Sequence, residues 1–199
     1  SGTTVAISSD GNTVAIGAPK NDDNGSDSGH VRVFDWNGSA WTQRGSDIDG
    51  EAASDYSGYH SISSDSNTIA IGAIYNDGNG SNSGHVRVFD WDGSAWTQRG
   101  EDIDGEAAGD ESGTASISSD GNTVAIGSYK NDGNGLDSGH VRVFDWDGSA
   151  WTQRGSDIDG EAAGDYFALV SMNNNGNTVA IGAWLNDGNG LDSGHVRVF

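Results

Sequence analysis

The sequence predicts an all-β fold, a β-propeller-like array of four-stranded antiparallel blades. Three observations support this prediction. One set of motifs recurs every 55 residues without insertion, Val, Ile, Thr, Trp and Phe gather in short clusters, and no segment keeps a 3.6-residue apolar period. With 32 glycines, one proline and 33% hydrophobic residues, the chain also lacks long runs of good helix formers. A regular array of equivalent β-sheets is therefore expected.

The repeat is the strongest of these observations. The segment NTVAIG or NTIAIG occurs four times, GSAWTQRG three times and GHVRVF four times, always at intervals of 55 residues. These intervals divide a single repeat domain, residues 1–199, into units at 1–55, 56–110, 111–165 and 166–199. Because one leucine-rich solenoid coil takes roughly 20–29 residues, a unit of this length fits a propeller blade better than a solenoid coil.

Each unit is expected to contain four strands, and the second unit illustrates them. Residues 59–65 alternate in character, and residues 68–73 are apolar or small after Thr68, as in a strand buried on both faces. The Ala and Gly residues of this second strand would let neighbouring sheets approach closely. Residues 85–91 and 95–103 are the expected third and fourth strands. Asp-Gly or Asn-Gly turns join strands one and two and strands three and four.

The fourth unit is incomplete. Residues 195–199 correspond to the start of a third strand, and nothing follows that corresponds to residues 145–165 of the third unit. We therefore expect three complete blades and a fourth that lacks its outer strand. An unpaired HVRVF edge invites pairing, so the expected partners are other copies of the chain or further repeats of a longer chain.

The segment TVAIGAPKNDDNGSDSGHVRVF, residues 13–34, resembles the FG-GAP repeats of integrin α-subunit propellers and of many microbial and algal surface proteins. The resemblance extends unit by unit over the chain. It implies a β-propeller at the cell surface or outside the cell, with adhesive, lectin-like or structural roles in the family. The GAP element is Gly17-Ala18-Pro19. The positions of the FG element are occupied by Ser57-Gly58, Ser112-Gly113 and Phe167-Ala168.

The charge of the chain argues against two classes of partner. With nine Lys and Arg against 30 Asp and Glu, the net charge is -21. A nucleic-acid surface needs clustered basic residues, and an anionic membrane surface would repel this chain. The sequence also holds no cysteine and no apolar run of membrane-spanning length. We therefore expect no nucleic-acid partner and no membrane insertion.

Calcium is the cofactor that the sequence suggests, although none is certain. The resemblance implies an Asp-rich calcium loop between strands one and two, but this chain has only the short SSDGNT segment there. Two other acidic loops offer hard oxygen ligands. Ordinary turns also favour Asn, Asp and Gly, so a purely structural role stays open. The candidate ligands are Asp77, Asn79, Asp132, Asn134, Asp137, Asp187, Asn189 and Asp192 in NDGNG-type loops, and Asp102, Asp104, Glu106 and Asp110 in the DIDGEAAGD loop.

Four histidines recur in phase, each directly after a Ser-Gly pair and at the start of a strand. A structural hydrogen bond is the simpler role for them, and a shared metal ring is the alternative. The 55-residue spacing would hold them apart unless they face the propeller axis. They are His30, His85, His140 and His195.

Two features concern glycans. Tryptophan pairs flank the hairpin between strands three and four, where they either pack across the strands or form a sugar-stacking platform. Three Asn-Gly-Ser sequons would accept glycans in a eukaryotic secreted protein. The tryptophans are Trp36, Trp41, Trp91, Trp96, Trp146 and Trp151, and the sequons begin at Asn24, Asn37 and Asn79.

The sequence favours a protein without enzymatic activity. It holds no nucleophile elbow, phosphate loop or His-Glu metal motif, and its distinctive residues are repeated in each unit. We expect an extracellular structural or adhesive repeat scaffold that takes part in a filament or surface assembly. The alternative is a lectin-like module that binds glycans or other ligands, surface proteins included, with or without calcium.

Overall fold

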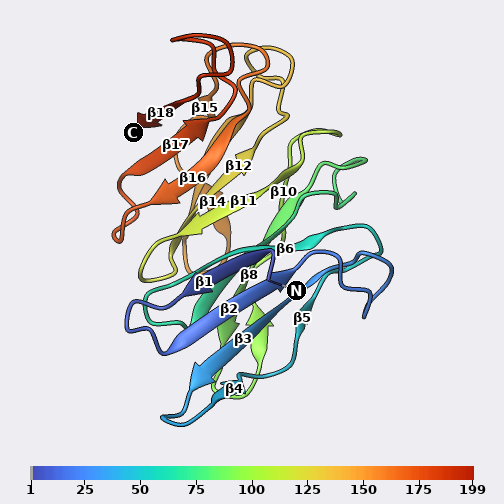
Figure 1. Cartoon of the computed structure of the whole chain (residues 1–199), viewed down its shortest axis with the longest axis vertical. Helices are drawn as coiled ribbons and strands as arrows, with labels where there is room; N and C mark the ends of the chain where they lie inside the picture. Colours follow the sequence, from blue (N-terminus) through green and yellow to red (C-terminus); the bar gives the residue numbers. More distant parts are fainter. Residues whose placement is uncertain (1) are drawn as a thin grey trace.

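The computed structural model describes residues 2–199, which form four antiparallel sheets and no helix. The sheets follow one another in chain order, from the first sheet beside the N-terminus to the fourth beside the C-terminus (Figure 1). They form an open array and not a closed ring. The first strands of successive sheets lie next to one another, as in a propeller. The predicted propeller-like array of blades is confirmed.

The first sheet contains β1 (Thr4–Ile7), β2 (Thr13–Ala18), β3 (His30–Trp36), β4 (Trp41–Gln43) and β5 (Ile48–Asp49). The second contains β6 (Ser57–Ile62), β7 (Thr68–Ala73), β8 (His85–Trp91), β9 (Trp96–Gln98) and β10 (Ile103–Asp104). The third contains β11 (Ser112–Ile117), β12 (Thr123–Ser128), β13 (His140–Trp146), β14 (Trp151–Gln153) and β15 (Ile158–Asp159). The fourth contains β16 (Phe167–Met172), β17 (Val179–Ala183) and β18 (His195–Val198). The fourth sheet thus lacks an outer strand, as predicted.

The predicted strand at 95–103 is wrong as a single element. β9 and β10 both pair with β8, β9 beside Phe89–Trp91 and β10 beside His85–Val86. Between them the chain leaves the ladder at Gly100, whose φ of +75° suits glycine. The predicted first strand at 59–65 also differs, because β6 begins at Ser57 with a bulge before Tyr59.

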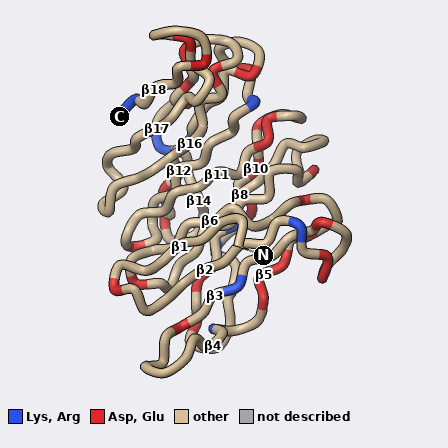
Figure 2. Tube along the Cα trace, viewed as in Figure 1, with Lys and Arg blue, Asp and Glu red and all other residues tan. Residues whose placement is uncertain are grey.

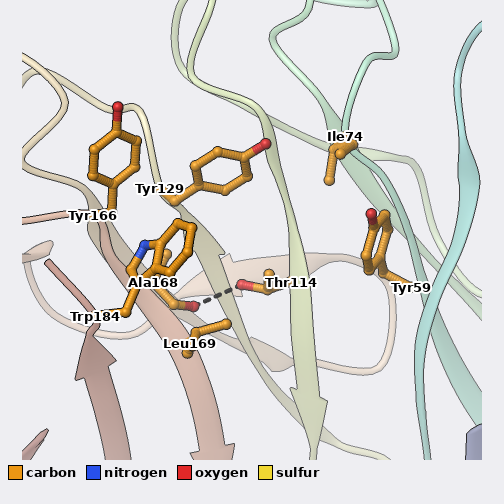
Figure 3. A pocket seen from close by; sticks show the side chains of 8 residues that line it. All are labelled: Tyr59, Ile74, Thr114, Tyr129, Tyr166, Ala168, Leu169 and Trp184. Atoms are coloured by element: carbon orange, nitrogen blue, oxygen red, sulfur yellow. Dashed lines mark hydrogen bonds between the residues drawn. The ribbon is translucent and has the colours of Figure 1, made fainter. Parts of the chain in front are cut away.

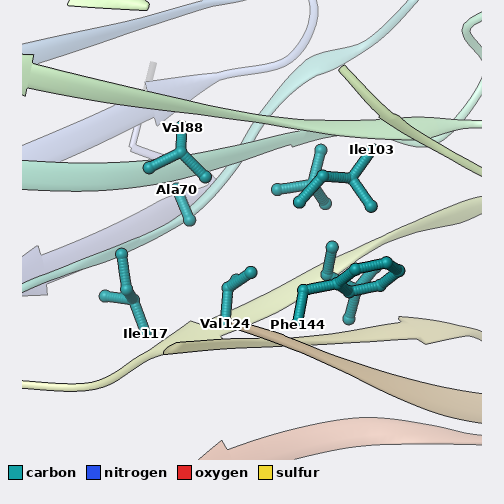
Figure 4. Close-up of a cluster of buried hydrophobic side chains, with 8 residues drawn as sticks. Ala70, Val88, Ile103, Ile117, Val124 and Phe144 are labelled. Carbon is teal, nitrogen blue, oxygen red and sulfur yellow. The ribbon is translucent and has the colours of Figure 1, made fainter. Parts of the chain in front are cut away.

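The hydrophobic core lies between the sheets, in three similar layers. In the layer between the second and third sheets, Ala70 and Val88 of one sheet face Ile117, Val124 and Phe144 of the next (Figure 4). The same positions form the layers on either side. Each inner sheet therefore buries both of its faces, which explains why β7 is buried at every position.

Glycine sets the distance between the sheets at the second strand. A Cβ atom on Gly72 would lie 1.8 Å from the carbonyl oxygen of Gly113 in the next sheet. The equivalent atoms on Gly17 and Gly127 would lie 2.0 Å and 2.1 Å from backbone oxygens of the following sheet. Only glycine fits such a close backbone contact. The predicted close approach of neighbouring sheets is confirmed.

Arginines link each sheet to its neighbours. Arg99 binds the carboxylate of Asp90 within its own sheet at 2.6 Å and donates to the carbonyl of Gly121 in the next sheet at 2.7 Å. Arg142 donates backwards, to the carbonyl of Asp104 at 2.6 Å. Equivalent bonds recur in the other units, at Arg44, Arg87 and Arg154. These charge-assisted bonds fix how one blade is oriented on the next.

The two ends of the array each present one open sheet face. The N-terminal face of the first sheet exposes Val5 and Ile7, and the C-terminal face of the fourth sheet exposes Leu169, Val196 and Val198. The equivalents of Ile7, Val196 and Val198 in the inner sheets lie in the layers between the blades. The open faces are thus the two unmatched halves of the same interface.

The charged residues lie mainly in the loops. Figure 2 shows acidic residues gathered in loops along the array, with the few basic residues between them. Among residues 2–199, no helix is long and apolar enough to cross a membrane.

Candidate functional site

An aromatic pocket lies beside the first strands of the second, third and fourth sheets (Figure 3). Its volume is about 280 Å³. Its wall is mainly apolar and presents several aromatic rings, which suits an apolar group or a sugar ring that stacks on them. The lining residues are Tyr59, Ile74, Thr114, Tyr129, Tyr166, Ala168, Leu169 and Trp184.

This aromatic pocket gathers residues that differ between the units. Two variable positions of the repeat each contribute three residues to the wall. From residue 21 of each unit onward, by contrast, the copies are nearly identical. The units therefore present nearly the same residues over most of the surface and differ from one another at the pocket. The two positions carry Thr4, Tyr59, Thr114 and Leu169, and Pro19, Ile74, Tyr129 and Trp184.

The aromatic rings of the pocket are arranged around Tyr166. Its ring centroid lies 6.2 Å from that of Tyr129 and 5.9 Å from that of Trp184, the second pair edge to face. Beside these rings, the hydroxyl of Thr114 donates to the carbonyl of Ala168 at 2.7 Å and so fixes the third sheet against the fourth (Figure 3). The rings are thus held by neighbours in a preformed arrangement.

A buried glutamate supports this wall from behind. Glu111 accepts hydrogen bonds from the hydroxyl of Tyr129 and, at 2.7 Å, from the ammonium group of Lys130. Burial and the bond to Glu111 raise the pKa of Tyr129 well above its ordinary value, and the Glu111 carboxylate also raises the pKa of Lys130. Tyr129 is therefore a neutral phenol and Lys130 a cation over the physiological pH range. Neither group is poised for proton transfer at neutral pH.

The backbone is strained beside the pocket. Tyr56, Glu111 and Tyr166, the first residues of the later units, have φ values of +55°, +51° and +52°. Such values are uncommon outside glycine and cost free energy. The amide of Glu111 donates to the carbonyl of Asn82 at 3.0 Å, and that of Tyr166 to Asp137 at 3.2 Å. These bonds hold the strained residues and direct Tyr166 into the pocket.

Histidine and carboxylates meet at a second set of places. Three groups of His, Asp and Glu side chains hold their ligand-type atoms within 4.8 Å of one another in the described part of the chain. Each group contains one of the phased histidines, so these three do not share a ring. The first His–carboxylate group is Asp23, His30 and Asp47, the second is Glu51, His85 and Asp102, and the third is Glu106, His140 and Asp157.

The predicted calcium ligands lie in two adjacent loops, where they serve two roles. In the NDGNG-type loops, Asp132 caps its own loop by accepting a hydrogen bond from the amide of Asp137 at 2.8 Å, and Asp77 and Asp187 do the same for the amides of Asn82 and Asp192. The amides of Asn79 and Asn134 donate to carbonyls of the DIDGEAAGD loop. Asn189 lies in the exposed loop of the fourth unit.

In the DIDGEAAGD loop, the carboxylate of Asp110 accepts from the amide of Ala107 and from Asn131 of the next unit. Burial raises the pKa of the neighbouring Asp104, and Asp102 and Glu106 belong to His–carboxylate groups. Most of these oxygens therefore serve turns and links between units. Calcium binding by these loops stays a prediction.

The tryptophan pairs pack across their hairpins. Trp91 and Trp96 are directly opposite each other, with ring centroids 5.4 Å apart. The indole of Trp96 also donates to the carbonyl of Arg44 in the preceding sheet at 3.0 Å, and Trp151 repeats this bond to Arg99. Trp36 and Trp41 have no preceding described sheet and are more exposed. The structure thus gives these rings a packing role, and sugar stacking on them stays a prediction.

The three sequons differ in whether the side-chain nitrogen of the asparagine donates a hydrogen bond. Those of Asn24 and Asn79 donate to backbone carbonyls across the blade, at 2.7 Å and 2.8 Å. Asn37 lies at an exposed hairpin turn, and its side-chain oxygen accepts from Ser39 and Ala40. All three residues are exposed, but the amide nitrogens of Asn24 and Asn79 would have to give up these hydrogen bonds to accept a glycan.

Sequence reasoning from the repeated residues does not find the aromatic pocket. The signal lies in the residues that break the repeat, at the first strand and at the turn after the second strand. The second and third His–carboxylate groups are also hidden, because Glu51 and Glu106 come from the unit before the histidine. Only the packing of one blade on the next brings these residues together.

Solved structures resemble this fold at low sequence identity. TolB from Acinetobacter baumannii matches with a TM-score of 0.56 and 13% identity over 98% of this chain and 43% of its own. A protein provisionally identified as TolB from Agrobacterium tumefaciens matches with a TM-score of 0.56 and 16% identity over 98% of this chain and 63% of its own. A provisionally identified 6-phosphogluconolactonase from Bacteroides fragilis matches with a TM-score of 0.58 and 14% identity, over 98% and 57%. This chain thus spans less than two thirds of each, and the likeness shows the fold alone.

Sequence comparisons are more specific for the first unit. No curated protein sequence matches the chain. Residues 1–34 match the FG-GAP repeat family, and they include the literal Gly17-Ala18-Pro19 element. The resemblance expected from the sequence is therefore confirmed for residues 1–34.

Proposed function

We propose that this chain is a non-enzymatic, extracellular structural or adhesive scaffold whose blades join to further blades of the same kind. The observation that carries the proposal is the pair of open end faces. Val196 and Val198 are exposed at the C-terminal face, whereas their equivalents Val86 and Val88 are buried against the next sheet. The N-terminal face exposes Val5 and Ile7, which occupy the positions that pack on a preceding sheet.

The two end faces are complementary to each other. In each layer, the Val-rich face of one sheet covers the Ile- and Phe-containing face of the next. The C-terminal end face carries the Val-rich surface, and the N-terminal end face carries the Ile- and Phe-containing surface. Such a head-to-tail contact extends into a filament when the rotation between copies does not close a ring. Further repeats of a longer chain would use the same contact. The acidic surface keeps such an assembly soluble along its sides.

Sedimentation of the purified chain over a wide concentration range tests the proposal. We expect concentration-dependent association that Ile7→Asp and Val198→Asp each reduce, because each places a charge on one half of the contact. Thr97→Asp, at an exposed position of β9, is the matched control. A chain that stays monomeric at every concentration, or association that the control reduces equally, contradicts the proposal. Antibody labelling of intact cells of the source organism tests the extracellular location.

A second candidate function is binding of a glycan or another small ligand in the aromatic pocket. The observation that favours it is the gathering of non-repeated residues in the pocket wall. A glycan array followed by tryptophan fluorescence titration would test it, with and without calcium. We expect Trp184→Ala to abolish binding and Trp91→Ala to spare it. The opposite result would place the ligand on the hairpin tryptophans.

A further inference from the structure

The first His–carboxylate group holds a buried imidazole nitrogen that lacks a hydrogen-bond partner. His30 is 3% exposed, and its Nδ1 atom makes no hydrogen bond among residues 2–199. This nitrogen faces carboxylate oxygens of Asp47 at 3.2 Å and Asp23 at 3.6 Å. Asp49 lies at 4.0 Å. An unpartnered buried polar atom costs free energy, so its position demands an explanation.

The carboxylates around this nitrogen are open to solvent on their outer side. The side chains of Asp23 and Asp49 are substantially exposed, and that of Asp47 is partly exposed. The hollow in front of them is also lined by Lys20 and Arg32. Three carboxylates thus lie within 4.0 Å of one imidazole nitrogen. A cation can enter from solvent and relieve the repulsion between them.

The donor set selects the kind of cation. One imidazole nitrogen with two or three carboxylate oxygens suits zinc and other divalent transition metals. Calcium takes six to eight oxygen ligands, and this group does not offer that set. The ligand-type atoms of Asp23, His30 and Asp47 already lie within 4.8 Å of one another. Zinc bonds of about 2.0–2.2 Å would draw them closer by small movements of the exposed aspartates.

The other units provide an internal comparison. Gly78 and Gly133 replace Asp23 in the second and third units, and a glutamate of the preceding blade takes its place near the histidine. Those glutamates also contact arginines, Glu51 with Arg87 at 3.4 Å and Glu106 with Arg142 at 3.8 Å. Arginine therefore competes for the glutamate there. The first unit alone supplies an additional carboxylate from its own loop.

We infer that the first unit carries a binding site for a divalent transition-metal cation such as zinc. Nδ1 of His30 and the carboxylates of Asp23 and Asp47 are its ligands, and Asp49 is a fourth ligand or accepts a hydrogen bond from bound water. The second and third His–carboxylate groups bind the same cation more weakly. The site is separate from the aromatic pocket. It adjoins the N-terminal end face, because a blade that packs there would bring its own glutamate toward His30, as Glu51 approaches His85 at 4.0 Å.

Calorimetric titration of the full chain with zinc chloride tests this inference, and cobalt absorption reports the coordination. We expect one site that binds tighter than the rest and a rise in melting temperature with zinc. Calcium at the same concentration should not compete with zinc for this site. Asp23→Gly should weaken the tight site by about tenfold or more, because it removes one ligand. The amide of residue 23 donates to Asn21 as that of Gly78 does to Asn76, so this variant keeps the loop fold.

Matched variants separate the site from unspecific binding. His30→Gln should abolish the tight site, and His85→Gln in the second unit should leave it intact. The cobalt spectrum of the wild type should show nitrogen and oxygen ligation that His30→Gln removes. Equal zinc affinity in the wild type and Asp23→Gly, equal loss in the two histidine variants, or no saturable binding would each overturn the inference.

Discussion

The inner and end blades carry almost the same sequence in different surroundings. The segment HVRVF occurs in β8 and in the C-terminal stretch that contains β18. Val88 of β8 is 1% exposed, and its equivalent Val198 of β18 is 66% exposed. The difference does not come from the residues, because they are identical. It comes from the presence or absence of a following sheet, so a blade is stabilised largely by its neighbour.

The same comparison holds for the second strands. β7 and β12 are buried at every position, whereas β2 and β17 alternate between buried and partly buried residues. A second strand whose sequence predicts burial on both faces is thus only partly buried when its sheet lies at an end of the array. Substitutions at equivalent positions of inner and end blades therefore measure what the neighbouring blade contributes.

The largest difference is expected for a charge in the core. Val88→Asp should lower the free energy of unfolding by at least about 4 kcal/mol, since it buries an unpaired carboxylate between two sheets. Val198→Asp should change it by about 0.5 kcal/mol or less at concentrations where the chain is monomeric. Urea denaturation of both variants measures the difference. Similar losses would mean that the inner layer does not depend on its neighbour.

A methyl group at the close backbone contact should give the next largest difference. Gly72→Ala should cost about 1–3 kcal/mol or more, because the added Cβ would overlap the carbonyl of Gly113. At Gly182, the nearest atom to an added Cβ is 3.5 Å away, in ordinary van der Waals contact. Gly182→Ala should therefore be close to neutral. Thermal unfolding of the pair is a suitable measurement, and a tolerated Gly72→Ala would show that the sheets can separate.

Loss of an arginine link should have an intermediate effect. Arg142→Ala should cost about 1.5–3 kcal/mol, because it removes the charge-assisted bond to the carbonyl of Asp104 and the contact with the ring of Phe144. Arg32 occupies the same position in the first unit, where residues 2–199 hold no preceding sheet to accept its hydrogen bond, and it keeps the contact with the ring of Phe34. Arg32→Ala should cost about 0.5 kcal/mol or less. If urea denaturation gives equal losses in the free energy of unfolding for Arg142→Ala and Arg32→Ala, the bond between blades does not stabilise the array.

The smallest effect is expected from His60, which the end units replace by Val5 and Val170. Burial lowers the pKa of His60 below its ordinary value of about 6.5, and backbone hydrogen bonds oppose this in part. The unfolded chain therefore takes up the proton more readily. Stability should fall as pH drops below about 6.5, by at most about 1.4 kcal/mol per pH unit for this group.

The valine of the end units gives the control for this pH dependence. His60→Val should reduce the slope of stability against pH between about 6.5 and 5, measured by urea denaturation at each pH. His140, whose pKa is also lowered mainly by burial, should keep part of the slope. An unchanged slope in His60→Val would show that His60 does not titrate differently on folding.

The repeated elements of the fold could be predicted from the sequence. The second and third strands of the second unit have the predicted bounds, and the missing outer strand follows from the repeat. The break between β9 and β10 could not be predicted in the same way. Gly100 permits the break, but the bonds of Arg99 to Asp90 and to the next sheet hold it, and these tertiary bonds are not visible in the sequence.

The candidate sites could be predicted only in part. The phased histidines are visible in the sequence, but the glutamates beside His85 and His140 come from the preceding blade. The aromatic pocket combines residues of three units, Tyr59, Tyr129 and Trp184 among them. Their proximity depends on how far each blade rotates relative to the last. That rotation is set by packing and not by any single unit.

The near-identity of the units has a consequence for folding. β8 and β13 share the sequence HVRVFDW, so either strand matches the second strand of its neighbour's sheet almost as well as its own. Side chains alone distinguish correct from exchanged hairpins poorly, and such exchange is a characteristic error of repeat chains. The loop between the second and third strands of each unit keeps the third strand beside its own partner. A cut in that loop would remove the tether and let copies exchange third strands.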